Sequence, residues 1–156
     1  VQVNATAING VDVSGLAGTL DNFLHCVKSV PNLEWIVQRN EETKPLWEQL
    51  DALLAKGELP KNISFLFDAS CGTGVLPSSF PPLLAHDCQC GYAGGIGPKN
   101  AYQVLNGIYE VVKAQGSPPV WIDMESSLRS IVAGKDVFNV VKVFDCINEY
   151  VRYIES

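Results

Sequence analysis

Residues 63–74 read Ile-Ser-Phe-Leu-Phe-Asp-Ala-Ser-Cys-Gly-Thr-Gly, an apolar run that ends in Asp68 and continues into a glycine-containing turn. A short apolar run bounded by turn residues is typical of a strand that is covered on both faces of a sheet. We therefore expect a buried strand over 63–69. The polar residues after it would lie at the carboxyl end of the strand, where α/β folds bind their ligands.

The same strand signal recurs along the chain and alternates with helical patterns. Further strands are expected at 1–5, 33–38, 88–93 and 120–124. Apolar residues at helical spacing predict helices within 20–27, 46–54 and 98–112, and from about 136 to 154. The proline-rich stretch 77–82 allows only a short helical turn. Such alternation indicates βα units and a parallel sheet, either a five-stranded doubly wound sheet or part of an eight-stranded barrel.

The composition is that of one globular domain of 156 residues, with 47% apolar side chains and a net charge of −6. The excess of acidic over basic residues, 17 against 11, argues against a nucleic-acid-binding surface. No apolar run approaches the ~18 residues that a membrane span needs. We expect a single domain over residues 1–156 that contacts neither nucleic acid nor a membrane.

The cysteines and histidines predict neither a disulfide framework nor a metal site. The five cysteines form no CxxC pair, and the two histidines have no ligand spacing relative to them. His86 precedes the fourth strand at the end opposite the ligand side, so we do not expect it to act in catalysis. These features favour a reducing, cytoplasmic location. Walker A and GxGxxG motifs are absent, so no cofactor is expected.

Polar residues and glycines follow four of the five expected strands. They are Gln2 and Asn4 after the first strand, Asp68 and Cys71-Gly72-Thr73-Gly74 after the third, Gly94 and Gly95 after the fourth, and Asp123, Ser126, Ser127 and Arg129 after the fifth. Backbone N–H groups in glycine-rich turns, with the N-terminus of the next helix, attract anions. The three later turns would together hold one phosphate. The alternative is that the glycines only permit tight turns.

Two aspartates end apolar strands, and each has two interpretations. Asp68 lies at the mouth of an apolar core and is placed to donate a proton as a general acid. The competing interpretation is that it caps a turn through loop amides. For Asp123 a structural role is favoured, in which Glu125, Ser127 and Arg129 satisfy its carboxyl group. Arg129 itself would form a surface ion pair or contact a ligand carboxylate.

The order of these motifs resembles the second half of phosphoribosylanthranilate isomerase, a (β/α)₈ TIM barrel of tryptophan biosynthesis. The family's fourth strand has a Gln-Leu-His-Gly-type motif, approximated by Gln2-Val3-Asn4-Ala5. Its sixth strand ends in Asp before a Gly-Gly-Thr-Gly loop, similar to Leu66-Phe67-Asp68 and Cys71-Gly72-Thr73-Gly74. Its seventh and eighth strands resemble Ala93-Gly94-Gly95-Ile96 with Pro98-Lys99-Asn100, and Asp123-Met124-Glu125-Ser126-Ser127-Leu128-Arg129.

The resemblance implies that residues 1–156 form strands four to eight of such a barrel. It implies an Amadori rearrangement, in which an acid helps to open the ring of a phosphoribosylamine and a base removes the proton from the sugar C2. Asp68 would be the acid. The phosphate would be bound by Gly72, Thr73, Gly74, Gly94, Gly95, Ser126 and Ser127. The substrate would be lined by Gln2, Asn4, Asp123 and Arg129. The family's base, a cysteine on its first strand, has no counterpart here.

A partial barrel would leave two open sheet edges and an apolar inner face. We therefore expect a fragment or processed piece, paired with a second polypeptide that supplies about three βα units. Self-association of half-barrels is the other possibility. Two further functions stay open. One is a non-catalytic barrel that binds a phosphorylated metabolite or a partner protein, and the other is a flavodoxin-like module with its first strand at the sheet centre.

Overall fold

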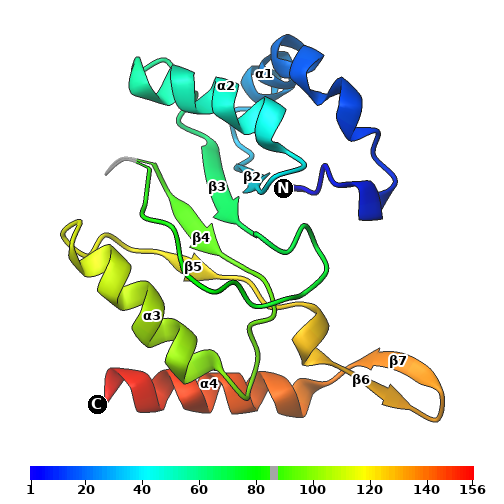
Figure 1. Ribbon diagram of the computed structural model, residues 1–156, viewed down its shortest axis with the longest axis vertical. Helices are drawn as coiled ribbons and strands as arrows, with labels where there is room; N and C mark the ends of the chain where they lie inside the picture. The colour runs from blue at the N-terminus through cyan, green and yellow to red at the C-terminus, as the bar shows by residue number, and fades with distance from the viewer. Residues whose placement is uncertain (85–87) are drawn as a thin grey trace.

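The computed structural model describes residues 1–84 and 88–156 and contains a five-stranded parallel sheet (Figure 1). Its strands are β1 Gln2–Val3, β2 Trp35–Arg39, β3 Ile63–Phe67, β4 Cys90–Tyr92 and β5 Trp121–Ile122. The helices are α1 Leu20–Ser29, α2 Lys44–Ala55, α3 Ala101–Lys113 and α4 Val140–Ile154. Short 3₁₀ helices are η1 Ala7–Asn9, η2 Val13–Gly18 and η3 Ser126–Leu128. The predicted α/β class with a parallel sheet is confirmed.

The strands lie in the order β1-β2-β3-β4-β5, so each pairs only with its neighbours in sequence. A doubly wound sheet reverses its strand order at a switch point, and this sheet has no reversal. β1 lies at one edge and β5 at the other. The flavodoxin-like interpretation, which needs the first strand at the centre, is therefore wrong.

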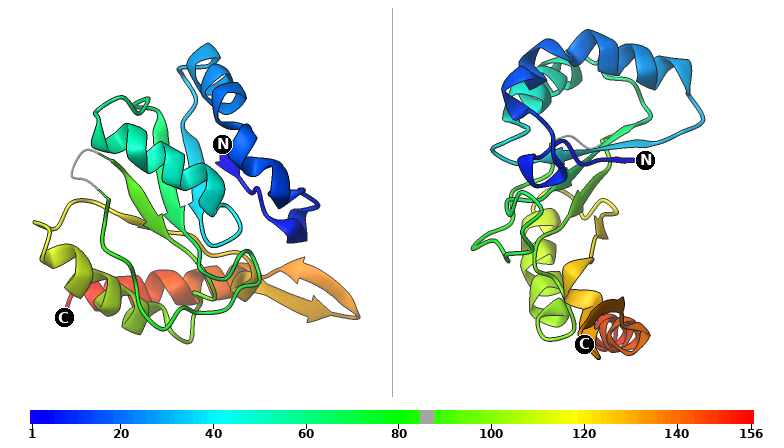
Figure 2. Two further views of the ribbon diagram at one scale, coloured as in Figure 1. Left: turned by 45° about the horizontal axis from the view of Figure 1, so that its top comes forward. Right: turned by 90° about the vertical axis from the view of Figure 1, so that its right-hand side faces the viewer.

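The core lies between the sheet and the helices, which follow one side of the curving sheet (Figure 2). Every residue of β3 is buried, as the apolar run predicts, and Phe65 is fully shielded from solvent. Leu50 of α2 and Val104 and Ile108 of α3 pack into the same core cluster. Because β3 is central and covered, its carboxyl end is held firmly at the middle of the ligand side.

The last helix begins later than the sequence predicts. Residues 129–138 form an antiparallel hairpin of β6 Arg129–Val132 and β7 Lys135–Phe138, and this hairpin projects away from the sheet (Figure 1). Its turn residues Ala133 and Gly134 have φ values of 50° and 76°. Two residues at positive φ match the twist of a two-residue hairpin, although Ala is an unusual choice. α4 starts only after Asn139, whose side chain accepts from the Val141 amide.

Two other local predictions have different outcomes. Residues 77–82 contain no helical turn and run as an irregular segment. His86 lies outside the described residues. No helix within residues 1–84 and 88–156 combines the length and apolar character needed to cross a bilayer.

Candidate functional site

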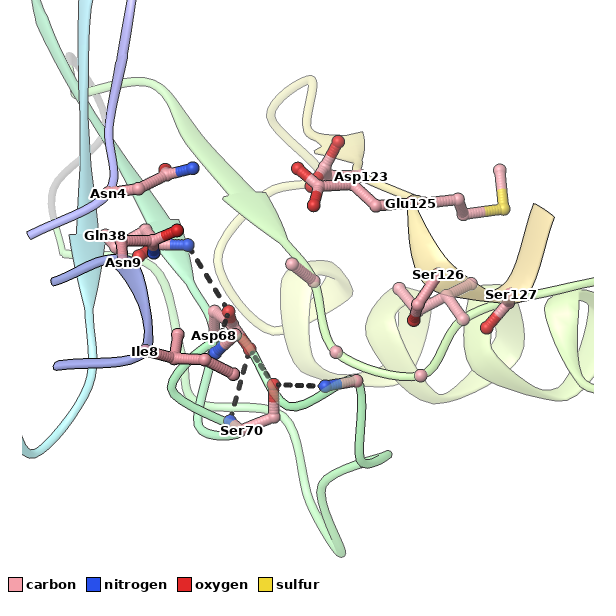
Figure 3. Close-up of a pocket in the computed structure, with 17 residues that line it drawn as sticks. Asn4, Ile8, Asn9, Gln38, Asp68, Ser70, Asp123, Glu125, Ser126 and Ser127 are labelled. Atoms are coloured by element: carbon pink, nitrogen blue, oxygen red, sulfur yellow. Dashed lines mark hydrogen bonds between the residues drawn. The ribbon is translucent and has the colours of Figure 1, made fainter. Parts of the chain in front are cut away.

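A cavity of about 160 Å³ opens at the carboxyl ends of the strands (Figure 3). All five strands contribute to it. The lining residues are Asn4, Ile8, Asn9, Gln38, Asp68, Ser70, Gly72, Gly74, Ala93, Gly94, Gly95, Ile96, Asp123, Met124, Glu125, Ser126 and Ser127. This is the edge at which parallel α/β sheets bind ligands.

Asp68 is 4% exposed and organises the loop that follows β3. Its Oδ1 accepts from the Ser70 amide at 3.1 Å and from the Ser70 hydroxyl. Its Oδ2 accepts from the Gly72 amide at 3.1 Å and from Gln38 Nε2 at 3.4 Å. The carboxylate thus caps the turn, as the competing interpretation proposes. The interpretation of Asp68 as a general acid assumes apolar surroundings, whereas the structure surrounds its carboxylate with hydrogen-bond donors.

The loops after β3, β4 and β5 meet at one rim of the sheet. A Cβ added to Gly95 would lie 2.6 Å from the Leu76 amide nitrogen and 2.7 Å from the Gly74 carbonyl oxygen. A Cβ on Gly74 would lie 2.5 Å from the Ser126 hydroxyl oxygen. Gly74 and Gly95 also have φ values of 72° and 63°. Backbone conformation therefore favours glycine at both positions, and the close approach of backbone atoms adds a second requirement for glycine at Gly95.

The backbone amides of these loops fall into two groups. Those of Gly72, Thr73 and Gly74 already donate to Asp68 Oδ2, the Ser70 carbonyl and the Ser70 hydroxyl. Within residues 1–84 and 88–156, the amides of Gly94, Gly95, Ser126 and Ser127 donate to no protein acceptor. Of the backbone amides in these three loops, those available to a ligand therefore lie after β4 and β5.

Asp123 is the second carboxylate of the cavity and is half-buried. Burial raises its pKa above the usual value, and the negative charges of Glu125 and Asp68 raise it further. From the sequence, we expect Glu125, Ser127 and Arg129 to be the partners of the Asp123 carboxyl group. Within the part of the chain that the structure describes, none of these side chains donates a hydrogen bond to it. Arg129 instead forms an ion pair with Asp136, 2.7 Å away in the hairpin.

The cavity brings together most of the residues that the sequence predicts. Gln2, Thr73 and Arg129 are the predicted residues that do not line it. Sequence reasoning misses Asn9, Gln38, Ser70 and Glu125, together with the apolar wall of Ile8, Ile96 and Met124. The available signal for Gln38 is its place as a polar residue near the carboxyl end of an apolar strand, the same signal that Asp68 gives.

The electrostatic character of the cavity is acidic. Asp68, Asp123 and Glu125 line it, and the described lining contains no Lys or Arg. A bound anion would therefore depend on backbone amides and hydroxyl groups. Among residues 1–84 and 88–156, no cluster of three His, Cys, Asp or Glu side chains is arranged to hold a metal ion.

No family model matches the chain, and neither the curated proteins nor the solved structures contain a match. The resemblance to phosphoribosylanthranilate isomerase therefore consists of the four short motifs alone. The cavity, its hydrogen bonds and the strand order bear on function independently of those motifs.

Proposed function

We propose that this chain is a sector of a (β/α)₈ barrel that binds a phosphorylated sugar-like molecule, and that the completed barrel isomerises it. The observation that carries the proposal is the cavity at the carboxyl ends of five consecutive parallel strands, with four unpaired amides on its rim. Phosphate sites of such barrels use the loops after the last two strands. In this chain, the last two strands of the parallel sheet are β4 and β5.

The open edges of the sheet support completion by further βα units. Among the residues that the structure describes, β1 and β5 each have one edge without a pairing strand, and folded proteins normally cover such edges. Beside β5, α4 exposes apolar side chains at alternating spacings of four and three residues. They are Val140, Phe144, Ile147, Val151 and Ile154. This spacing matches a seam that packs against another helix. A second polypeptide that supplies a strand next to β5 and a helix next to α4 would cover the open edge of β5 and the apolar face of α4.

The phosphate is bound by the amides of Gly94, Gly95, Ser126 and Ser127. The described lining contains no basic side chain that could pair with the phosphate, so the affinity for phosphate depends on the dipoles of these backbone amides. The amides of Gly72, Thr73 and Gly74 do not bind the phosphate, because they already donate within the loop after β3.

The reaction is an Amadori rearrangement of a phosphoribosylamine. An acid gives a proton to the ring oxygen, the C1–O bond breaks, and the nitrogen lone pair forms an iminium group. A base then takes the C2 proton, and the resulting enol tautomerises to a ketone. Asp68 is the acid that the resemblance implies, and Asp123, with its raised pKa, is the alternative donor. The base comes from the units that complete the barrel, and the reaction takes place in the cytoplasm.

A second candidate function is binding without catalysis. The observation that favours it is that Asp68 already accepts hydrogen bonds from Ser70, Gly72 and Gln38. A carboxylate used in this way shapes a loop and need not transfer a proton. In this alternative, the site binds the same class of phosphorylated ligand and leaves it unchanged.

Calorimetric titration of the chain with ribose 5-phosphate and with ribose tests the binding proposal. We expect the phosphate ester to bind at least about tenfold more tightly, since only the ester reaches the four amides. Equal affinities would contradict the phosphate site. In the completed assembly, Asp68→Asn and Asp123→Asn then separate the two functions. Loss of turnover with retained binding in either variant supports catalysis, whereas an absence of turnover in the unaltered assembly supports the binding function.

A further inference from the structure

The side chain of Gln38 is buried at the floor of the cavity and is only partly satisfied. It is 4% exposed, and its Nε2 donates to Asp68 Oδ2 at 3.4 Å. Its Oε1 is buried and accepts no hydrogen bond from the described residues. Buried polar atoms in proteins nearly always have a partner, and a ligand is one kind of partner that can complete the set.

Neighbouring side chains do not explain this unpaired oxygen. Asn9 lies beside Gln38, but its Nδ2 donates to Thr6 Oγ1 at 2.8 Å. Turning the Gln38 amide over would place Oε1 against the Asp68 carboxylate, where two acceptors would face each other. The contact with Asp68 therefore fixes which end of the amide is Oε1, and Gln38 is one of the residues that line the cavity.

We propose that Gln38 accepts a hydrogen bond from a hydroxyl group of the ligand and thereby makes the β2 side of the cavity a sugar-hydroxyl subsite. This inference deepens the proposed function and rests on it for the position of the phosphate. Asp123 faces the same space from the β5 side (Figure 3) and takes a second hydroxyl donor.

The distribution of donors and acceptors supports this division of the cavity. The unpaired amides of Gly94, Gly95, Ser126 and Ser127 are donors, which suit the acceptor oxygens of a phosphate. Gln38 Oε1 and the carboxylates of Asp123 and Glu125 are acceptors, which suit hydroxyl donors. A phosphorylated polyol offers both kinds of group on one small molecule. A ligand without hydroxyl donors leaves Gln38 unsatisfied.

Nuclear magnetic resonance on the isotope-labelled chain tests the subsite directly. The readouts are the side-chain NH₂ signals of Gln38 and the backbone amide signals of Gly94, Gly95, Ser126 and Ser127. The probes are ribitol, ribose 5-phosphate and inorganic phosphate. We expect ribitol to shift the Gln38 signals, inorganic phosphate to shift the backbone signals, and ribose 5-phosphate to shift both sets.

Substitution adds a quantitative arm. Gln38→Met keeps the length of the side chain and removes the acceptor, so the dissociation constant for ribose 5-phosphate should rise about tenfold while that for inorganic phosphate is unchanged. Gln49→Met is the matched control, because Gln49 is half-buried on α2, does not line the cavity and bonds only to backbone carbonyls. It should change neither constant.

The outcomes separate the two proposals. If phosphate shifts the rim amides and neither polyol nor sugar phosphate shifts Gln38, the subsite is overturned and the phosphate site stands. If ribitol shifts Gln38 and no phosphorylated probe shifts the rim, the subsite stands and the proposed function fails. If no probe shifts either set, both are overturned. These measurements use the unaltered chain, so they decide the matter even if Gln38→Met fails to fold.

Discussion

Asp68 and Asp123 show how two aspartates at the ends of strands acquire different roles from their surroundings. Asp68 accepts hydrogen bonds from the loop that follows it, and these bonds hold the turn in shape. Asp123 has a backbone hydrogen bond at Met124, but its burial and the negative charges of Glu125 and Asp68 outweigh this contact and raise its pKa. Asp68 therefore shapes the loop through its hydrogen bonds, and Asp123 is the carboxyl group whose pKa is raised above its usual value.

The raised pKa of Asp123 predicts a pH-dependent effect of Asp123→Asn. The folded chain holds the Asp123 proton more tightly than the unfolded chain does, so this group's contribution to stability is full below the ordinary value of 3.8. It is lost as the pH rises through the raised value. The variant should therefore gain stability relative to the unaltered chain as the pH rises, by less than about 1 kcal/mol because solvent screens a half-exposed group.

Urea unfolding between about pH 3 and pH 7 measures this difference in the free energy of unfolding. Glu58→Gln, at an exposed position after α2, controls for the loss of one negative charge. A stability difference between the Asp123 variant and the unaltered chain that stays constant over this range would contradict the prediction.

For single residues, the sequence predicts where a side chain lies in the fold better than it predicts which groups that side chain contacts. Asp68, Asp123 and the glycines can be placed at one rim because the carboxyl ends of parallel strands share an edge. Their partners depend on which loops touch, and this depends on packing between segments far apart in the chain. For this reason the sequence leaves the role of Asp68 open and misses Gln38, whose unpaired oxygen is visible only once β2 is placed beside β3.

Among the connecting elements, the loop after β4 is the most constrained by packing. Gly95→Ala should destabilise the chain by about 2–4 kcal/mol, because the added Cβ meets backbone atoms of the loop after β3 as well as an unfavourable φ. Gly116→Ala is the matched control. Gly116 also has a positive φ, of 84°, but a Cβ there meets nothing within 4 Å, so we expect a cost of about 1 kcal/mol.

Denaturant unfolding of the two glycine variants compares these costs. If both variants lose similar amounts of unfolding free energy, backbone conformation alone requires glycine at Gly95. The close approach of the loops after β3 and β4 would then be refuted. A larger loss for Gly95→Ala supports the packed rim on which the site depends.

The hairpin shows why one element escapes prediction. Its strands, Arg129–Val132 and Lys135–Phe138, are short, and the turn at Ala133-Gly134 lacks the usual Asn-Gly signal. Val137 also continues the helical spacing of α4, so periodicity alone extends that helix by several residues. The four helices are predictable because strongly periodic segments dominate their sequences, and the five strands of the main sheet because short apolar runs bounded by turn residues mark them.

At the scale of the whole molecule, the sheet is open and α4 is largely uncovered. Outside the five seam residues, Val141 and Tyr150 of α4 are exposed as well. A monomeric protein rarely leaves such a continuous apolar surface in water. We therefore predict that the isolated chain associates with copies of itself.

Light scattering coupled to gel filtration tests this association. The unaltered chain should have a mass above the 16.9 kDa of one copy. Phe144→Gln combined with Val151→Gln should shift it to the monomer and lower the stability by less than about 1 kcal/mol, since both side chains are exposed. Tyr109→Gln on α3, also exposed but outside the seam, should not. If the unaltered chain has the mass of a monomer at all concentrations, the prediction is contradicted.

The most direct test of the phosphate site is a crystal structure of the chain with ribose 5-phosphate. We predict phosphate density within hydrogen-bonding distance of the amides of Gly94, Gly95, Ser126 and Ser127. Phosphate density elsewhere on the chain, or an empty rim at saturating ligand, would contradict it.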